Sequence, residues 1–313
     1  MTIIKPPRLR KGDLIGLVSP ASTPSAEEKI QKGAQYFEHL GYRVKLGKYI
    51  RSEYGYLAGT DEHRASDFNE MVRDKNVKAI FAIRGGYGTP RILQMIDYRS
   101  LKANPKIIVG HSDITALQLA VFRKTGLVTF SGPMTGVEIW QGIDPYTEEH
   151  LWHLLTSTKK IGELKNPTDE PLKVLKDGNA HGQLIGGNLS LLACLMGTPF
   201  QPRLRGSILF LEDIEEAPHR VDRMLAQLLN AGVLSSLAAL VFGKFTDCDP
   251  SDSTKPYLTV DQLQEEYAEK IKCPVLSNFQ YGHIARKLTV PIGLHATLNT
   301  KQNKLEIKES AVV

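Results

Sequence analysis

The sequence predicts a two-domain α/β protein whose first half contains a parallel β-sheet covered by helices on both faces. Its 313 residues exceed the usual size of one domain. Short apolar runs alternate with helix-like segments through the first half. A stretch rich in Lys, Pro, Asp, Asn and Gly then separates the two halves. We therefore expect an N-terminal domain over residues 1–155, a connection over 156–181 and a C-terminal domain over 182–313.

The apolar runs of the first half are short, and polar turn residues or helix-like segments follow them. This alternation is typical of parallel strands, because a parallel pair needs a long crossover connection that is usually a helix. The expected strands cover residues 13–18, 42–46, 77–83, 106–110 and 127–130, and the expected helices cover 25–40, 62–73 and 113–124.

The second half shows one clear amphipathic helix. Within residues 220–230, apolar side chains recur with the spacing of a helix that lies on a core. A second, very apolar segment around Cys194 also reads as a helix, and we expect that cysteine in the core. The expected helices are 189–196 and 220–230, and the expected strands are 207–211, 238–242, 274–276 and 304–313.

Composition excludes several classes of protein. The net charge of +5 is scattered, so nucleic-acid binding is not expected. No apolar run reaches the ~18 residues of a membrane span, and residues 1–12 lack the apolar part of a signal peptide. The three cysteines form no CxxC pair, which argues against a disulfide framework and a zinc site. We expect a cytoplasmic protein without a metal or cofactor.

Ser112 is the first candidate for chemistry. It lies in Gly110-His111-Ser112-Asp113, between an expected strand and an expected helix. A sharp turn of this kind exposes the central side chain at the carboxyl edge of the sheet and directs free helix N–H groups to the same place. Ser112 can then attack a carbonyl, and the N–H of Asp113 can hold the oxyanion. A simple helix N-cap remains the alternative role.

The segment Arg84-Gly85-Gly86-Tyr87-Gly88 follows another expected strand and should reach the same edge. Consecutive glycines let the backbone approach a ligand closely, so the N–H of Gly86 is a candidate second oxyanion donor. A tight turn is the alternative. The segment lacks the order of a dinucleotide or phosphate loop, which argues against a nicotinamide oxidoreductase.

A nucleophilic serine needs a base and a group that orients it. Of nine histidines, His283 is preferred because it lies beside Gly282 in a loop that follows an expected strand. Glu212 ends a buried strand and can accept the imidazole N–H. His150 and His153, at i and i+3, lack the pattern of a metalloprotease.

Seven segments together resemble the LD-carboxypeptidase family over nearly the whole chain. Their order and spacing carry the resemblance. They are 11–13 with 19–21, 58–61, 84–88, 110–115, 186–189, 211–213 with 222–225, and 282–283 before 291–293.

The resemblance implies a Ser112–His283–Glu212 triad and an oxyanion hole of Gly86 and Asp113 N–H groups. It implies a flavodoxin-like N-terminal domain, a smaller β-rich C-terminal domain and a homodimer. Members hydrolyse the bond between an L-centre and the terminal D-amino acid of cytoplasmic murein tetrapeptides, a step in cell-wall recycling. Arg84 is a candidate for binding the substrate's carboxylate. His111 stands where the family often has Tyr, and we interpret it as a pocket wall, with a competing base as the alternative.

Two other functions remain open. Some members of the family are immunity peptidases that cleave microcin C-type aminoacyl-nucleotide antibiotics, and the triad motifs do not separate them from murein peptidases. A non-catalytic protein that binds a small molecule between two domains is the alternative from another class. A serine-reactive phosphonate would label Ser112 in an enzyme and leave it free in a binder.

Overall fold

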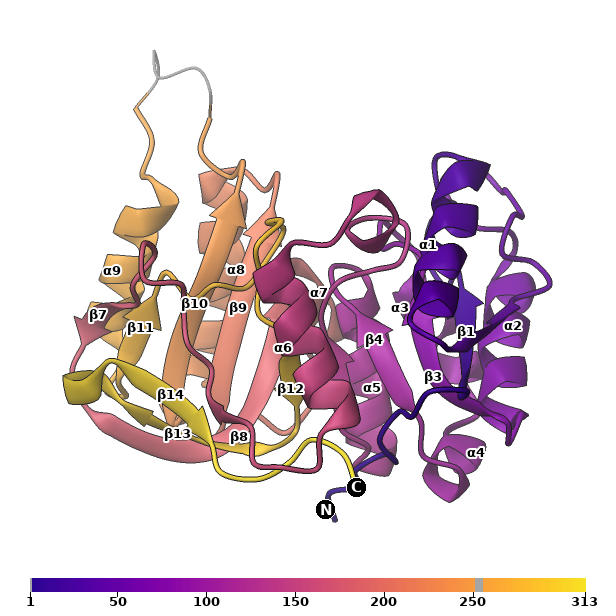
Figure 1. Ribbon diagram of the computed structural model, residues 1–313. Coiled ribbons are helices and arrows are strands. Elements are labelled where there is room, and N and C mark those ends of the chain that lie inside the picture. Colours follow the sequence, from indigo (N-terminus) through magenta and orange to yellow (C-terminus); the bar gives the residue numbers. More distant parts are fainter. Residues whose placement is uncertain (1, 251–255) are drawn as a thin grey trace.

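The computed structural model describes residues 2–250 and 256–313 and contains two β-sheets that stand side by side. Helices α5 (Ile114–Thr125), α6 (Pro145–Thr156) and α7 (Leu189–Leu195) lie in the middle of the molecule (Figure 1). The two ends of the chain meet, because the N–H of Arg8 donates to Val313 O at 2.8 Å. No helix in the described residues is long and apolar enough to cross a membrane.

The first sheet has six strands in the order β12-β5-β4-β3-β1-β2. Strands β1 to β5 are parallel, and the order 2-1-3-4-5 is that of flavodoxin-like folds. This confirms the predicted fold class. The bounds are β1 Leu14–Val18, β2 Arg43–Leu46, β3 Val77–Ala82, β4 Ile107–Gly110, β5 Thr129–Ser131 and β12 Val290–Ile292, with helices α1 Glu27–His39, α2 Asp61–Arg73, α3 Thr89–Ile92 and α4 Tyr98–Ala103.

Helix α5 is buried on nearly all of its faces, which explains why its sequence shows no polar stripe. One side packs on β4 and β5 of the first sheet, and another meets β8 (Asn179–Asn188) and α7 of the second. The helix that begins beside Ser112 is therefore held by both sheets.

The second sheet has eight strands in the order β6-β14-β13-β8-β9-β10-β11-β7. Its centre, β8-β9-β10-β11, is parallel, and the outer strands are antiparallel. The bounds are β6 Gly162–Glu163, β7 Lys173–Lys176, β9 Ile208–Ile214, β10 Ala239–Thr246, β11 Val275–Ser277, β13 His295–Asn299 and β14 Lys304–Ile307, with helices α8 Pro218–Asn230 and α9 Val260–Lys270.

Some local predictions were wrong. Cys194 is exposed, because α7 buries Leu189, Leu192 and Leu195 on its other face. The last strand ends at Ile307 rather than Val313. Helices α6 and α9 were not predicted. Apart from these errors, the connection expected over 156–181 contains strands β6 and β7 of the second sheet, and β12 pairs antiparallel with β5 of the first.

Candidate active site

Ser112 occupies a strained turn between β4 and α5. Its φ is +61°, a left-handed conformation that non-glycine residues rarely adopt. Gly110 makes the turn possible, since a Cβ at this position would lie 2.9 Å from a methyl carbon of Ile114. Strain of this kind persists only where the surroundings enforce it, and it is concentrated at functional sites. The structure thus has the geometry of a nucleophile elbow, as the sequence predicts.

The glycine loop after β3 lies directly against this turn. A Cβ at Gly85 would stand 2.8 Å from Ser112 Cβ and 3.0 Å from its Oγ. The Asp113 carboxylate fixes the loop by accepting the backbone N–H of Gly88 at 3.2 Å and of Thr89 at 2.8 Å. The sequence indicates only the backbone N–H of Asp113 as functional, and no local pattern reveals this role of its side chain. The loop and the elbow therefore form one unit.

Glu212 and His283 meet at the carboxyl ends of the second sheet. The His283 Nδ1 lies 2.7 Å from Glu212 Oε2. Burial alone would raise the pKa of Glu212, but the hydrogen bond and the charge of His283 outweigh it and hold that pKa below its usual value. The ionised carboxylate then accepts the Nδ1–H, which leaves Nε2 of His283 free for a proton transfer.

Two neighbours position this pair. Asn188 caps α7 through its Oδ1, which accepts the N–H of Leu191, and its Nδ2 also donates to Glu212 at 3.3 Å. Gly282 has a φ of +140°, and a Cβ there would lie 2.9 Å from the Lys244 carbonyl and 3.3 Å from Glu212 Oε2. Only glycine therefore lets the His283 loop pass this close to the carboxylate.

The elbow and the histidine are linked through His111. The rings of His111 and His283 lie edge to face, with centroids 4.9 Å apart. Among the described residues, the Ser112 hydroxyl makes no hydrogen bond within 3.5 Å, so the proposed nucleophile and base are not hydrogen-bonded to each other. Hydrogen bonds between catalytic groups are often long without substrate and tighten when it binds.

His111 belongs to a buried polar cluster that the sequence did not predict. Its Nε2 lies 2.9 Å from Glu138 Oε1 and 3.2 Å from Lys287 Nζ, and Lys287 also donates to Glu138. Burial and the Lys287 charge lower the pKa of His111 to about 4. His111 is therefore neutral at neutral pH and stands beside His283 as a wall. Glu138 and Lys287 lie far from His111 in the sequence, and no local pattern reveals them.

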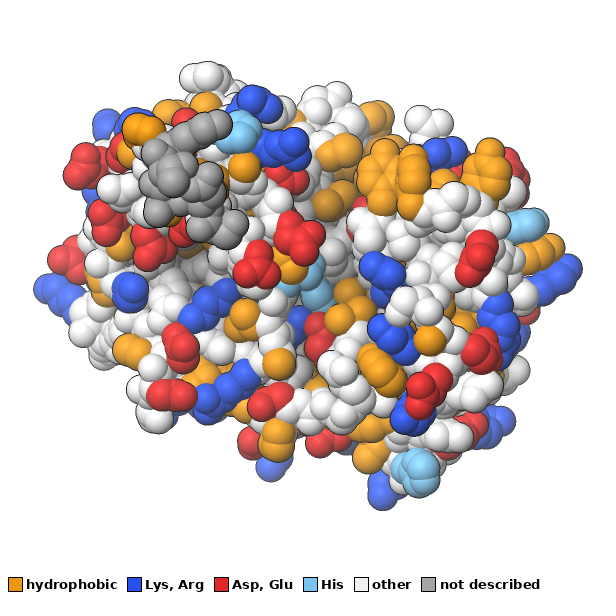
Figure 2. Space-filling model, turned by 90° about the horizontal axis from the view of Figure 1, so that it is seen from above, with side chains coloured by type: hydrophobic (Ala, Val, Ile, Leu, Met, Phe, Trp, Pro, Cys, Tyr) orange, Lys and Arg blue, Asp and Glu red, His pale blue; other side chains and the backbone are white. Residues whose placement is uncertain are grey.

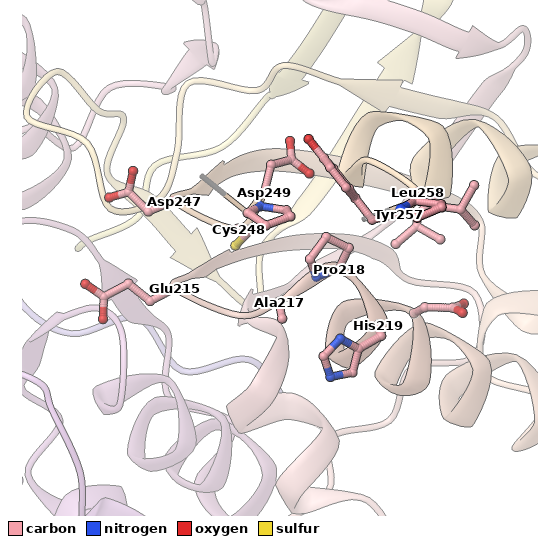
Figure 3. Close-up of a pocket in the computed structure, with 13 residues that line it drawn as sticks. Glu215, Ala217, Pro218, His219, Asp247, Cys248, Asp249, Tyr257 and Leu258 are labelled. Atoms are coloured by element: carbon pink, nitrogen blue, oxygen red, sulfur yellow. The ribbon is translucent and has the colours of Figure 1, made fainter. Parts of the chain in front are cut away.

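Several hollows adjoin these residues. A cavity of about 290 Å³ is lined by His111, Glu138 and His283. A larger one, of about 850 Å³, contains none of the proposed triad. Glu215 and Asp247 lie at one end of it and Tyr257 and Leu258 at the other (Figure 3). In Figure 2, histidine, acidic and basic side chains surround the hollow in the middle of the face seen from above.

The remaining predicted residues, Gly86 and Arg84, lie in the loop that follows β3. Gly86 is exposed with a φ of +103°, and a Cβ there would stand 3.7 Å from Arg84 Nη2. Arg84 is half-buried and donates to Thr23 O at 3.4 Å. Within residues 2–250 and 256–313, no three His, Cys, Asp or Glu side chains are grouped as metal ligands.

Known proteins match the chain over most of its length. Family models described as the LD-carboxypeptidase N-terminal and C-terminal domains match residues 15–132 and 181–298. A probable murein peptide carboxypeptidase of Bacillus subtilis is 41% identical, covering 97% of this chain and 94% of that protein. Microcin C7 self-immunity protein MccF of Escherichia coli is 29% identical, covering 96% of this chain and 94% of that protein.

Solved structures show the same architecture. MccF in complex with glutamyl sulfamoyl guanosine superposes with a TM-score of 0.90 at 28% identity and covers 99% of both chains. A muramoyltetrapeptide carboxypeptidase from Oxalobacter formigenes gives 0.82 at 31% identity, covering 95% of this chain and 98% of that one. The chain therefore belongs to the LD-carboxypeptidase family and is a serine-type carboxypeptidase.

Proposed function

We propose that this enzyme removes the terminal D-alanine from murein tetrapeptides by hydrolysing an L,D peptide bond. The observation that carries the proposal is the Glu212–His283 hydrogen bond beside the strained Ser112 turn. A carboxylate that orients an imidazole near a partly exposed serine is the arrangement of acyl-transfer hydrolases. The 41% identity to a probable murein peptide carboxypeptidase favours this substrate class over others.

In the proposed mechanism, His283 Nε2 takes the proton of Ser112 as Oγ attacks the scissile carbonyl. The N–H groups of Gly86 and Asp113 stabilise the oxyanion. The tetrahedral intermediate collapses, His283 protonates the leaving amine, and D-alanine departs from an acyl-enzyme. Water, deprotonated by His283, then attacks the ester and releases the shortened peptide and Ser112. Glu212 stabilises the imidazolium in both halves of the cycle.

The proposed triad draws its residues from both sheets, so its activity depends on how the two domains are placed relative to each other. Ser112 is held by the first sheet, and Glu212 and His283 by the second. A small closure on substrate binding would bring Nε2 to Oγ, and misplacement by ~1 Å costs about 10²-fold in rate. We place the reaction in the cytoplasm, as a step in wall-peptide recycling by a homodimer, because the family resemblance implies both.

The test compares the two substrate classes directly. The protein is incubated with a murein tetrapeptide and, separately, with an aminoacyl-adenylate of the microcin type, and D-alanine and free amino acid are measured by mass spectrometry. Release of D-alanine by the wild type and its loss in Ser112→Ala support the proposal. Cleavage of the adenylate alone assigns the immunity function instead. Cleavage of neither, with no labelling of Ser112 by a phosphonate, identifies a binding protein.

A further inference from the structure

A small cavity on the first sheet's side of the site has a basic lining. It measures about 260 Å³ and lies between the first turns of α1 and the loop that follows β5. It shares Val137 and Gln141 with the cavity that His283 lines, so the two hollows are neighbours. The lining residues are Ser25, Lys29, Arg84, Gly136, Val137, Trp140 and Gln141.

The two cations in this lining have no counterion. Among the described residues, no carboxylate oxygen lies within 4.0 Å of the Lys29 ammonium or the Arg84 guanidinium. Two other cations near α1 are paired, Lys32 with Glu28 at 2.6 Å and Arg51 with Glu27 at 2.6 Å. A guanidinium has five N–H donors, and Arg84 uses one of them, on Thr23 O. Two half-buried, unpaired positive charges in one cavity attract an anion.

The fold fixes both cations. Lys29 Nζ stands 5.0 Å from the centre of the Trp140 ring, within cation–π range. The loop that carries Trp140 is tied to the end of β3, because the N–H of Gly136 donates to Ile83 O at 2.7 Å. Arg84 directly follows Ile83. The same strand end therefore positions the guanidinium, the Trp140 loop and, through Gly85, the Ser112 turn.

This placement matches what a carboxypeptidase must recognise. Arg84 Nη2 lies beside Gly86, whose N–H is a proposed oxyanion donor, so the guanidinium is about one residue from the scissile carbonyl. In a tetrapeptide the group one residue beyond that carbonyl is the free α-carboxylate of the terminal amino acid. A cavity of about 260 Å³ has room for one small residue such as D-alanine.

We propose that Lys29 and Arg84, supported by Trp140, form the subsite that binds the α-carboxylate of the leaving D-amino acid and restricts the enzyme to the chain terminus. This inference rests on the proposed function and adds Lys29 as a specificity residue. Hydrogen bonds between charged groups are stronger than neutral ones, so we expect about a 10²-fold preference in kcat/KM for a free carboxylate.

The experiment compares a murein tetrapeptide with its C-terminal carboxamide. The wild type should prefer the acid by about 10²-fold in kcat/KM. Lys29→Met and Arg84→Met should each reduce the acid-to-amide ratio by about tenfold, mainly through KM, and the double variant should bring it near one. Arg84→Lys should keep part of the preference. Lys32→Met is the matched control, because Lys32 also lies over Trp140, at 5.9 Å, but does not line the cavity.

The outcomes separate the subsite from the proposed function. If the wild type cleaves acid and amide equally well, or the double variant keeps the preference, the subsite is wrong while the peptidase activity stands. If neither peptide is cleaved, the subsite is tested by binding. D-Alanine should then change Trp140 fluorescence, D-alaninamide should not, and Trp140→Phe should abolish the signal. Equal responses to both ligands, or none to D-alanine, would overturn the inference.

Discussion

The imidazole of His111 meets the ring of His283 edge to face, at 4.9 Å between centroids and 73° between planes. Behind His111, Lys287 and Glu138 form a buried ion pair. The charges of this pair balance, and the uncharged His111 separates them from the proposed base. The polar cluster thus supports the site without placing a net charge beside it.

Substitutions of Lys287 and Glu138 should have strongly non-additive effects on the free energy of unfolding. Lys287→Met leaves the Glu138 carboxylate buried without its cation, which typically costs 3–5 kcal/mol (roughly) of unfolding free energy. Adding Glu138→Gln removes the stranded charge, so the double variant should be more stable than Lys287→Met alone. Urea denaturation of the wild type, both single variants and the double variant gives the coupling energy. Additive effects would show that the two groups do not interact energetically.

The left-handed backbone conformation of Ser112 should lower the stability of the folded protein. A left-handed residue costs about 1–2 kcal/mol unless it is glycine. Ser112→Gly should therefore be more stable than Ser112→Ala by about 1 kcal/mol, while both lose at least ~10³-fold in kcat because the nucleophile is gone. Thermal or urea unfolding and D-alanine release measure the two effects. Normal turnover in either variant would remove Ser112 from the mechanism.

Glu212→Gln tests the acid of the proposed triad. The amide keeps the size of the side chain but no longer stabilises the imidazolium, so kcat should fall by about 10²–10⁴-fold. Glu215→Gln is the matched control, since Glu215 follows the same strand and is exposed. Steady-state kinetics with the tetrapeptide compare the two. Near-normal activity of Glu212→Gln would assign the acid to another residue.

Sequence patterns predict those residues of the candidate site that lie at the ends of strands. Glu212 and Ser112 each follow an apolar run, and parallel strands bring such ends to one edge of a sheet. The contact between His111 and Lys287 joins residues 176 positions apart, and periodicity does not encode it. Helix α5 shows a further limit, because burial between two sheets removes the polar face that would mark its orientation. Cys194 was misplaced for a related reason: an apolar run indicates burial without specifying the exposed face.

Asp213 and His111 should impose opposite pH dependences on stability. Burial and the neighbouring Glu212 charge raise the pKa of Asp213 from its ordinary 3.8 to about 6. The folded state therefore binds this proton more tightly than the unfolded state, so the Asp213 contribution is full below pH 3.8 and is lost as pH rises to about 6. His111 has its pKa lowered from 6.5 to about 4, so its contribution is full above pH 6.5 and is lost as pH falls to about 4.

Variants separate these two contributions. Relative to the wild type, Asp213→Asn should gain stability as pH rises from 4 to 6.5, by up to about 3 kcal/mol, because the ionisation penalty is gone. His111→Phe should gain relative stability in the opposite direction, as pH falls through the same window. Urea midpoints at half-unit steps of pH measure both slopes. Parallel slopes for the two variants would contradict the assignment, since the physical causes, a buried acid and a buried base, require opposite signs.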